Sequence, residues 1–424
     1  MTPEEWKLFL ENLRALGSRP GLCRIRQLLE LVGHPERGLC VIHITGTNGK
    51  GSCGRAMYAG LLSLGLAAGH FSSPELFSVN ERVSARGREI TDAELLSAAG
   101  EVRPAWERLA AAGDPPTEFE FFVALALVHF RAAGVTHAVI EVGMGGAKDA
   151  TNVFSDTALC VFTPISLDHT RFLGGTVAEI AREKSGILRP GCAAVTVAEQ
   201  EGEALSELAR AASAVGTELR LTAPETVRDA EYAADHTAFT YRGERIYLPL
   251  AGDFQVQNAS LAAEALRVLS ERRPEVRYPE ALRGFCNARL HGRFERVACA
   301  PDVYLDAGHN PAGNAALLAA IDRHLAGRPL VLVMAMYRDK DYPLCIRRLS
   351  ARAAAFYATQ SASPRALPAD EVAAVAAPLC AETVAVEDPA EAARRARDRA
   401  REVGGAVVIC GSFGHLARAM EGIR

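Results

Sequence analysis

The stretch HITGTNGKGSC, residues 43–53, decides how this chain is interpreted. An apolar run ends at Ile44, and a glycine-rich segment containing Lys50 leads into a helical pattern. Strand, glycine-rich turn and helix form the geometry that points backbone N–H groups and a helix N-terminus at an anion. The stretch therefore predicts a phosphate site, in which Lys50 would meet the β- and γ-phosphates and the Ser52 hydroxyl would reach Mg²⁺.

This loop departs in two places from the usual phosphate-loop pattern. Ile44 stands where that pattern has its first glycine, and Gly51 separates Lys50 from the hydroxyl residue. The alternative interpretation is a glycine-rich turn with a solvated lysine and no bound phosphate, which would match the loop pattern about as well. The strand before the loop and the helix after it favour the phosphate site.

Composition narrows the class of protein. The chain has 424 residues, which favours two domains, and 49% of them are hydrophobic. A net charge of −4 argues against a nucleic-acid-binding surface. No apolar run approaches the roughly 20 residues of a membrane span, and the N-terminus lacks a signal-peptide pattern. The ten cysteines include no CxxC pair, which favours reduced thiols. We expect a cytoplasmic protein that binds neither membrane nor nucleic acid.

The order of the elements predicts an α/β fold with two doubly wound domains. In the N-terminal part, apolar runs that read as buried parallel strands alternate with helical patterns. These runs are 39–44, 137–142, 158–165 and 193–198. A second series follows at 303–308, 329–336, 352–359, 383–388 and 405–412. Segment 290–295 is the expected linker, which gives an ATP-binding domain over 1–290 and a smaller domain over 291–424. Residues 237–250 predict an antiparallel hairpin added to the first sheet.

Further motifs keep one fixed order along the chain. They are GTNGKGS (46–52), SSPELFSVNERV (72–83), TEFEFFVALAL (117–127), EVGMGGAKDATN (141–152), LDHTRFLG (167–174), IAREKSGI (180–187), QVQNA (255–259), GRFE (292–295), DAGHNP (306–311), DKDY (339–342) and Gly411–Ser412. This ordered set resembles the folylpolyglutamate and dihydrofolate synthases of the Mur ligase superfamily. The resemblance implies a P-loop ATPase-like domain of the Mur central type, followed by a Rossmann-like glutamate ligase domain.

The resemblance also assigns nucleotide contacts, divided between the two predicted domains. Asn258 would contact the adenine, while Arg293, Asp306 and His309 would close over the ribose and phosphates. The residues implied for ATP are Gly46, Thr47, Asn48, Gly49, Lys50, Gly51, Ser52, Asn258, Arg293, Asp306 and His309.

Metal ligands are expected where buried strands end. Mg²⁺ prefers hard oxygen ligands, and Glu141 ends a buried strand at the edge where open α/β sheets bind ligands. By resemblance, Ser73 and Glu141 would hold one Mg²⁺, the ion on the nucleotide. The position of Ser52 at the helix start adds its hydroxyl as a further expected ligand. Glu141, His169 and a carbamylated Lys184 would hold a second.

The implied reaction is the ATP-dependent joining of a folate-type acid to L-glutamate through an acyl phosphate, by a monomeric enzyme. The expected catalytic residues are Lys50, His169, Lys184, Asp306 and His309. The expected substrate residues are Ser73, Pro74, Arg82, Asp149 and Ser412. The resemblance leaves open dihydrofolate synthesis, glutamate-chain extension or both.

Three positions depart from the family pattern on the acid-substrate side. Ala147 replaces the usual arginine, Lys148 follows it, and Glu75 stands where histidine is common. Lysine can restore the charge of arginine but not its two-pronged hydrogen bonding. These departures leave two alternatives open, namely a Mur-type ligase for a non-folate acid and a weakly active paralogue that binds nucleotide or folate.

Overall fold

The computed structural model describes all 424 residues, which form two compact units. Unit 1 comprises Met1–Thr226 and Asn258–Ala288, and unit 2 comprises Val227–Gln257 and Arg289–Arg424. The division after Ala288 lies two residues before the expected end of the first domain at residue 290. The sequence did not predict that residues 227–257, which lie between the two segments of unit 1, belong to unit 2.

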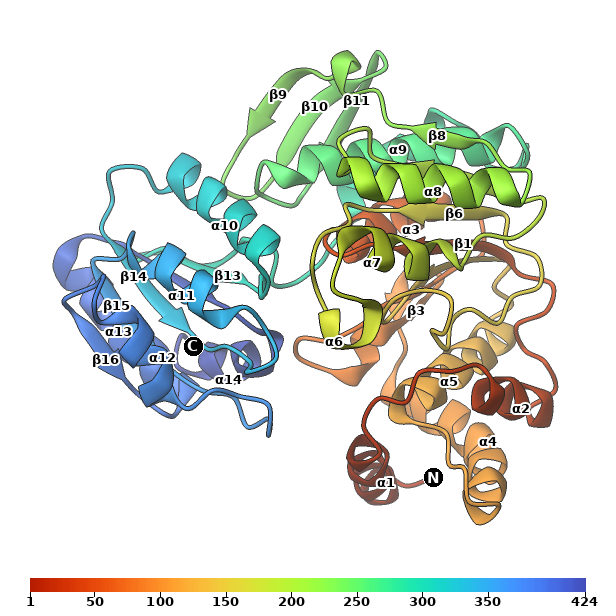
Figure 1. Ribbon diagram of the computed structural model, residues 1–424, viewed down its shortest axis with the longest axis horizontal. Coiled ribbons are helices and arrows are strands. Elements are labelled where there is room, and N and C mark those ends of the chain that lie inside the picture. Colours follow the sequence, from red (N-terminus) through yellow and green to blue (C-terminus); the bar gives the residue numbers. More distant parts are fainter. The chain divides into compact units, whose positions relative to one another are not determined.

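Unit 1 is built on an eight-stranded sheet in the order β4-β3-β2-β5-β1-β6-β7-β8 (Figure 1). The strands from β2 to β8 in this order are parallel, whereas β3 and β4 are antiparallel at one edge. The strands are β1 (Cys40–Thr45), β2 (Ala68–Phe71), β3 (Val83–Ala85), β4 (Arg88–Glu89), β5 (His137–Glu141), β6 (Leu159–Phe162), β7 (Ala193–Thr196) and β8 (Leu219–Leu221). The four strands expected in this part correspond to β1, β5, β6 and β7.

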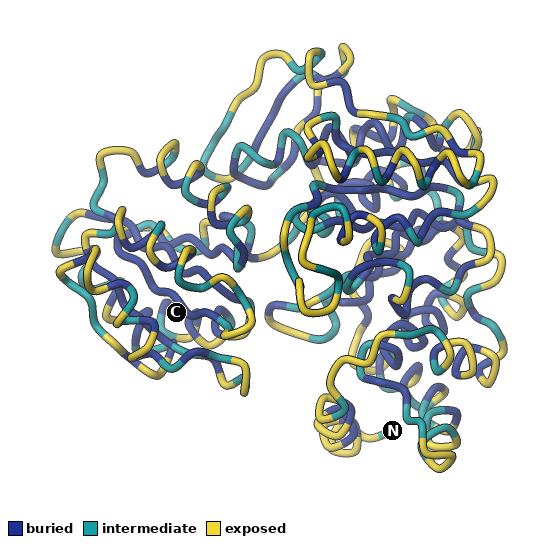
Figure 2. The backbone as a smooth tube through the Cα atoms, in the orientation of Figure 1, coloured by how far each residue is buried: buried dark blue, intermediate teal, exposed yellow.

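Helices flank this sheet and build two of its apolar cores. The helices are α1 (Pro3–Ala15), α2 (Cys23–Leu31), α3 (Lys50–Ser63), α4 (Asp92–Ala111), α5 (Glu118–Ala132), α6 (Thr170–Leu173), α7 (Val177–Ser185) and α8 (Gly202–Ala214). Side chains of α1, α2, α4 and α5 pack in one core with alternate residues of β5 such as Ala138 and Ile140. Side chains of α7 and α8 pack in another core with β6 and β7. Figure 2 shows the central strands buried and the outer sides of the helices exposed.

The helix α5 shows how local sequence sets an element's start. Thr117 accepts a hydrogen bond from the backbone of Glu120, and the Glu120 carboxylate accepts one from the backbone of Thr117. This reciprocal capping box satisfies two donors that the first helical turn leaves without partners. The TEFE stretch of the sequence is therefore a helix start, and Arg24 pairs with the buried Glu120 carboxylate at 3.0 Å.

Unit 2 contains a six-stranded sheet in the order β12-β13-β17-β14-β15-β16. All neighbours are parallel except β12, which runs antiparallel to β13. Its elements are β12 (Glu295–Ala298), β13 (Val303–Asp306), α10 (Pro311–His324), β14 (Leu330–Met334), α11 (Tyr342–Ser350), β15 (Ala355–Ala358), α12 (Ala369–Ala376), β16 (Thr383–Ala385), α13 (Pro389–Val403), β17 (Ala406–Cys410) and α14 (Leu416–Glu421). The fold class predicted from the sequence, two α/β domains, is confirmed.

The expected hairpin exists, but its sheet is a different one. Strands β10 (Thr237–Tyr241) and β11 (Glu244–Leu248) pair antiparallel, and β10 also pairs with β9 (Arg228–Tyr232). They form a separate three-stranded sheet, so the prediction that the hairpin extends the first sheet is wrong. The helix α9 (Phe254–Ser270) follows this small sheet.

Candidate active site

The phosphate loop lies between β1 and α3 of unit 1. Gly46 and Gly49 have φ angles of 147° and 93°, and α3 begins at Lys50. Because the first N–H groups of a helix have no partner within it, the start of α3 presents donors to an anion. Gly51 and the buried Ser52 lie in this first turn.

The segment after β6 supports the loop from one side. The backbone N–H groups of Thr47 and Asn48 donate to the carbonyl of Pro164, at 2.8 and 3.4 Å. The Thr47 hydroxyl donates to the carbonyl of Ser166 and accepts a hydrogen bond from its N–H, both at 3.0 Å. These hydrogen bonds hold the loop in its observed conformation.

Two glycines of the loop are required by close contacts. A Cβ added to Gly46 would lie 1.9 Å from Thr163 Oγ1, and one added to Gly49 would lie 2.3 Å from Asn258 Oδ1. Both glycines also have φ angles that residues with a Cβ rarely adopt. Asn258 therefore lies directly against the phosphate loop.

Two lysines converge on one backbone oxygen of the loop. Lys50 Nζ donates to the carbonyls of Gly46 at 3.2 Å and Thr47 at 3.3 Å. Lys184 Nζ, from α7, donates to the same Gly46 carbonyl at 2.8 Å. Burial, reinforced by the charge of Lys50, lowers the pKa of Lys184 to about 7. At neutral pH a large fraction of Lys184 is therefore an uncharged amine, which is the nucleophilic form.

Glu141 brings a carboxylate to the same edge of the sheet. It is the last residue of β5, and it pairs in register with Ile44, which lies two residues before Gly46. Its side chain is buried, as is that of Ser52. Parallel strands present their carboxyl ends at one edge, so β1 and β5 place the phosphate loop and this acid together.

His169 stands at the start of the short helix α6 and has a φ angle of 49°. Its backbone N–H donates to Asp168 Oδ1 at 2.8 Å, and its side chain is 34% exposed. Sequence reasoning expects this imidazole to bind metal. The imidazole is partly exposed, so a metal ion could reach it.

These residues suit magnesium in part. A buried carboxylate and serine hydroxyls are hard oxygen donors, which fit an ion that retains waters and phosphate oxygens. No group of three or more His, Cys, Asp or Glu side chains in the chain is arranged so that it could hold a metal ion by itself. A site built here must therefore also use hydroxyls, phosphate oxygens or a carbamate. Lys184 as an ammonium group cannot ligate a cation.

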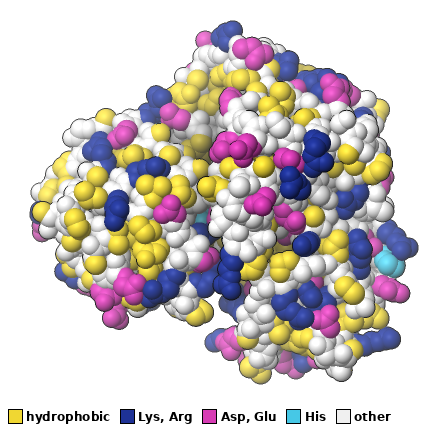
Figure 3. Space-filling view, in the orientation of Figure 1, with side chains coloured by type: hydrophobic (Ala, Val, Ile, Leu, Met, Phe, Trp, Pro, Cys, Tyr) yellow, Lys and Arg dark blue, Asp and Glu magenta, His cyan; other side chains and the backbone are white.

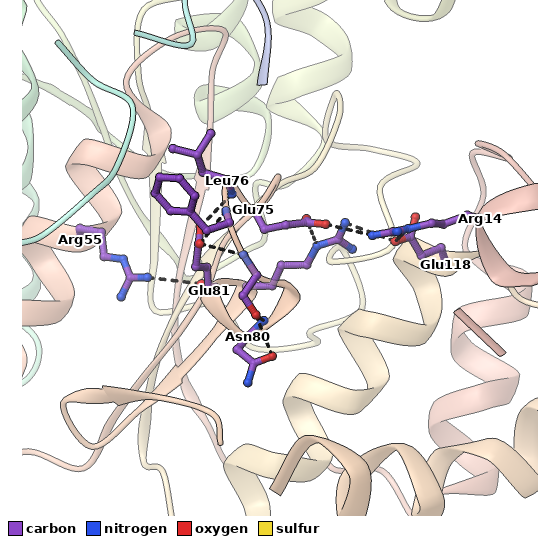
Figure 4. Close-up of polar contacts among 10 residues, drawn as sticks. Arg14, Arg55, Glu75, Leu76, Asn80, Glu81 and Glu118 are labelled. Carbon is purple, nitrogen blue, oxygen red and sulfur yellow. Dashed lines mark hydrogen bonds and ion pairs between the residues drawn. The ribbon is translucent and has the colours of Figure 1, made fainter. Parts of the chain in front are cut away.

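The loop 72–82, which the sequence predicts to border the acid substrate, contains a charge network (Figure 4). In this loop Ser73 is half-buried and Pro74 is exposed. Glu75 Oε2 accepts a hydrogen bond from Arg82 at 2.5 Å, and Glu75 Oε1 lies 3.3 Å from Arg14. Arg82 also lies 3.3 Å from Glu118. Its guanidinium is 4.4 Å from the ring centre of Phe122.

This network accounts for one of the three departures. Burial disfavours ionisation of Glu75, but Arg82 and Arg14 outweigh it and hold its pKa below the ordinary value. Glu75 is therefore an ionised partner of two arginines, which ties the loop to α1 and α5. Arg82, which the sequence predicts to bind substrate, forms ion pairs with Glu75 and Glu118. Its substrate role stays a prediction.

Glu81 orders the same loop from within. Its carboxylate accepts hydrogen bonds from the backbone N–H groups of Leu76 and Phe77, both at 2.8 Å, and of Ser78 at 3.0 Å. Figure 4 shows Glu81 beneath this turn, with Arg55 reaching its backbone. The NER motif therefore fixes the shape of the loop that holds Ser73.

Replacing Glu75 with glutamine is expected to lower the free energy of unfolding by about 1.5–3 kcal/mol at pH 7, since it removes a charge-assisted hydrogen bond to Arg82. Because the pKa of Glu75 is depressed, its contribution is present at neutral pH and is lost as pH falls through that pKa. Urea unfolding at a series of pH values measures this. An equal deficit at pH 7 and in strong acid would contradict the assignment, and Glu107→Gln on α4 is the surface control.

Asp149 is engaged within its own loop. Its carboxylate accepts hydrogen bonds from the backbone of Met144 at 2.8 Å and from the backbone and hydroxyl of Thr151, at 3.0 and 2.6 Å. Burial raises its pKa, against these hydrogen bonds. The adjacent Ala147 packs against Gly186, and Lys148 is exposed. The structure therefore gives Asp149 an evident loop-forming role, and its substrate role stays a prediction.

Unit 2 gathers its own polar residues at the carboxyl ends of β13 and β17. Asp306 ends β13, and its oxygens accept hydrogen bonds from the backbones of Gly308 at 2.7 Å and Phe294 at 3.0 Å. Burial raises its pKa, and Arg293 partly offsets the rise. His309 Nδ1 lies 3.0 Å from the carbonyl of Ala307.

Sequence reasoning missed two residues of this group. The Arg293 guanidinium lies over the Phe413 ring, 4.9 Å from the centre of that ring. The centres of the Phe413 and His309 rings are 6.2 Å apart. His415 Nδ1 lies 3.0 Å from the Ser412 hydroxyl in a fully buried pair, and burial lowers the pKa of His415 to about 3. Ser412 thus has a neutral partner. The GSFGH stretch could have suggested both residues, since it directly follows a buried strand.

No helix in the chain has the length and hydropathy that a membrane span needs. All ten cysteines are free thiols. None of the residues described above is a cysteine.

Comparison with known proteins gives two family matches that together span most of the chain. The Mur ligase middle domain matches residues 44–266, and the Mur ligase glutamate ligase domain matches residues 292–413. The first match alone covers more than half of the chain, and it begins at the strand that leads into the phosphate loop.

Individual relatives agree with these matches. The chain is 34% identical to folylpolyglutamate synthase of Lacticaseibacillus casei, over 81% of this chain and 82% of the relative. It is 35% identical to dihydrofolate synthase/folylpolyglutamate synthase of Bacillus subtilis, over 82% and 83%. A crystal structure of Mycobacterium tuberculosis folylpolyglutamate synthase with ADP and AMPPCP superposes with a TM-score of 0.89 and 31% identity, covering 98% of this chain and 96% of that one.

Proposed function

The chain belongs to the folylpolyglutamate and dihydrofolate synthase branch of the Mur ligases, and from that premise we propose how its own residues carry the reaction. It is an ATP-dependent ligase that joins a folate-type acid to L-glutamate. The observation that carries the proposal is the convergence of Lys50 and Lys184 on the Gly46 carbonyl, in the loop between β1 and α3.

The reaction proceeds in two steps. A carboxylate oxygen of the folate-type acid attacks the γ-phosphorus of ATP, the bond to the β-phosphate oxygen breaks, and ADP leaves. The amine of L-glutamate then attacks the acyl carbon, loses a proton and displaces inorganic phosphate, which leaves an amide. Lys50 and the N–H groups at the start of α3 stabilise the charge on the transferring phosphoryl group.

Other residues position the reactants. Asn258 and residues 46–52 bind the nucleotide, and Ser73, Pro74 and Arg82 border the acid. Among the residues of unit 2, we propose Arg293, Asp306 and His309 for nucleotide binding and Ser412 for glutamate binding. Mg²⁺ held by Ser52, Ser73 and Glu141, with a second ion at Glu141, His169 and carbamylated Lys184, would supply positive charge at the phosphate oxygens.

Phosphate release across three acids tests the substrate. We expect release that requires ATP, L-glutamate and either dihydropteroate or tetrahydrofolate, and none above background with a UDP-muramyl acid. The first acid reports dihydrofolate synthesis and the second reports glutamate addition to a reduced folate. Release with the UDP-muramyl acid alone would overturn the folate assignment while keeping the ligase chemistry, and no release with any acid would overturn both.

A further inference from the structure

A cavity lies at the N-terminal ends of the parallel strands β1 and β5 of unit 1, whereas the phosphate loop follows the C-terminal end of β1. It has a volume of about 640 Å³, and the first residues of β1 and β5, Cys40 and His137, lie in its wall. At about 3.3 Å per residue, the six-residue β1 separates Cys40 from Thr45 by roughly 17 Å. The cavity is therefore distinct from the site at the carboxyl ends of these strands. Its size falls within the range of small-molecule pockets.

Three arginines line this cavity, and none has an acidic partner. Arg26 comes from α2, Arg37 from the loop before β1, and Arg273 from the segment after α9. No carboxylate lies within ion-pair distance of any of the three guanidinium groups, whereas most other arginines of unit 1 form such pairs. Arg273 also lies beside the Cys40 thiol, whose pKa burial raises against the effect of that guanidinium.

Four acidic residues also lie in the wall, but none of them forms an ion pair with the three guanidinium groups. Glu36 is 2.9 Å from His34 Nδ1, and Glu275 is 3.4 Å from His137 Nε2. Glu30 and Asp156 are exposed, as are Arg26 and Arg37. On the side where Figure 1 draws α2, Figure 3 shows basic, acidic and histidine side chains grouped on the surface.

We propose that this cavity binds a small organic molecule that carries oxyanion groups, through Arg26, Arg37 and Arg273. Guanidinium groups match the geometry of carboxylates and phosphates, and an arginine with no acidic partner can form both hydrogen bonds of such a pair. Leu29, Leu39 and Val153 in the same wall would contact the apolar part of the ligand. This site goes beyond the ligase reaction, because it contains none of the residues that we assign to ATP, the acid or glutamate.

The test uses two probes, tricarballylate for carboxylates and glycerol 3-phosphate for phosphates. Calorimetric titration is carried out on the full chain with the nucleotide site saturated by AMPPCP. We expect at least one probe to bind, and the double variant Arg26→Ala/Arg37→Ala to bind it about tenfold more weakly. Arg108→Ala removes an exposed arginine on α4 outside the cavity and should bind like the unaltered protein. The probe that binds identifies the oxyanion class.

Cys40 supplies a readout at the site itself. Alkylation of each cysteine is followed by mass spectrometry, with the exposed Cys286 and Cys299, which lie outside the cavity, as internal controls. We expect the bound probe to slow alkylation of Cys40 only. Ligase activity of the double variant should be unchanged, which shows that it folds. The proposal is overturned if neither probe binds, if the double variant binds as tightly as the unaltered protein, or if Cys40 is not protected.

Discussion

Replacing Lys50 with alanine is expected to lower kcat/KM for ligation by about 1,000-fold, which corresponds to roughly 4 kcal/mol of lost transition-state stabilisation. Lys50 is the cation of the phosphate loop, and it already lies within hydrogen-bond distance of the Gly46 and Thr47 carbonyls. In the proposed reaction it stabilises charge on the phosphoryl group as that group moves. Its removal should therefore lower kcat in addition to weakening ATP binding.

The measurement is steady-state phosphate release with dihydropteroate or tetrahydrofolate, ATP and L-glutamate. Lys7→Ala is the matched control, because Lys7 is an exposed lysine of α1. The melting temperature of Lys50→Ala should stay close to that of the unaltered enzyme, since no ion pair is lost. Turnover within a few-fold of the unaltered enzyme would show that the loop does not perform phosphoryl transfer.

Replacing Lys184 with methionine is expected to lower kcat by about 100-fold or more, the scale of one lost electrostatic contact in a buried site. Methionine fills a similar volume in the buried environment and carries no charge, so the variant should fold. Its stability should equal or exceed that of the unaltered enzyme, because a buried amine is costly in its charged form.

The pH dependence tests the carbamate more specifically. The pKa of Lys184 is depressed to about 7, below its ordinary value of 10.5, so the neutral amine that reacts with CO₂ becomes dominant as pH rises through 7. Activity in CO₂-free buffer should therefore be low, and bicarbonate should restore it more completely at pH 8 than at pH 6. Lys184→Met should not respond to bicarbonate. Equal activity with and without CO₂ would contradict the carbamate, and Lys184 would then act only as an amine that contacts the phosphates.

The same pKa shift has a consequence for stability. Between about pH 7 and 10.5, the unfolded chain binds a proton at Lys184 that the folded chain has lost. Stability therefore rises with pH across that window. Lys184→Met should remove this part of the pH dependence, and this effect is independent of catalysis.

The sequence allowed four strands of the first sheet, five strands of the second and the loop between β1 and α3 to be predicted, for identifiable reasons. Strands such as β1 and β5 are buried along nearly their whole length, so they appear as continuous apolar runs bounded by glycine or polar residues. The phosphate loop is local in sequence, so its glycines, lysine and following helix can be recognised without the rest of the fold. Glu141 could be placed because it ends the buried strand β5, whereas His169 lies seven residues beyond the end of β6, at the start of α6.

Other features could not be predicted, because they depend on long-range contacts or weak patterns. The exposed strand β9 lacks an apolar alternation, so its pairing with β10 has no sequence signal. The ion pairs of Glu75 with Arg14 and Arg82 could not be predicted from the sequence. Arg14 lies 61 residues away in the sequence, and only the fold brings the two together.

The most direct test of the central claim is the fate of an oxygen atom. The folate-type acid is prepared with ¹⁸O in its reacting carboxylate, and the released inorganic phosphate is analysed by mass spectrometry. Because that carboxylate attacks the γ-phosphorus and the acyl carbon–oxygen bond breaks afterwards, we expect one ¹⁸O in each phosphate released. Phosphate without ¹⁸O, formed while the amide accumulates, would contradict the acyl-phosphate route and the role we assign to the loop at residues 46–52.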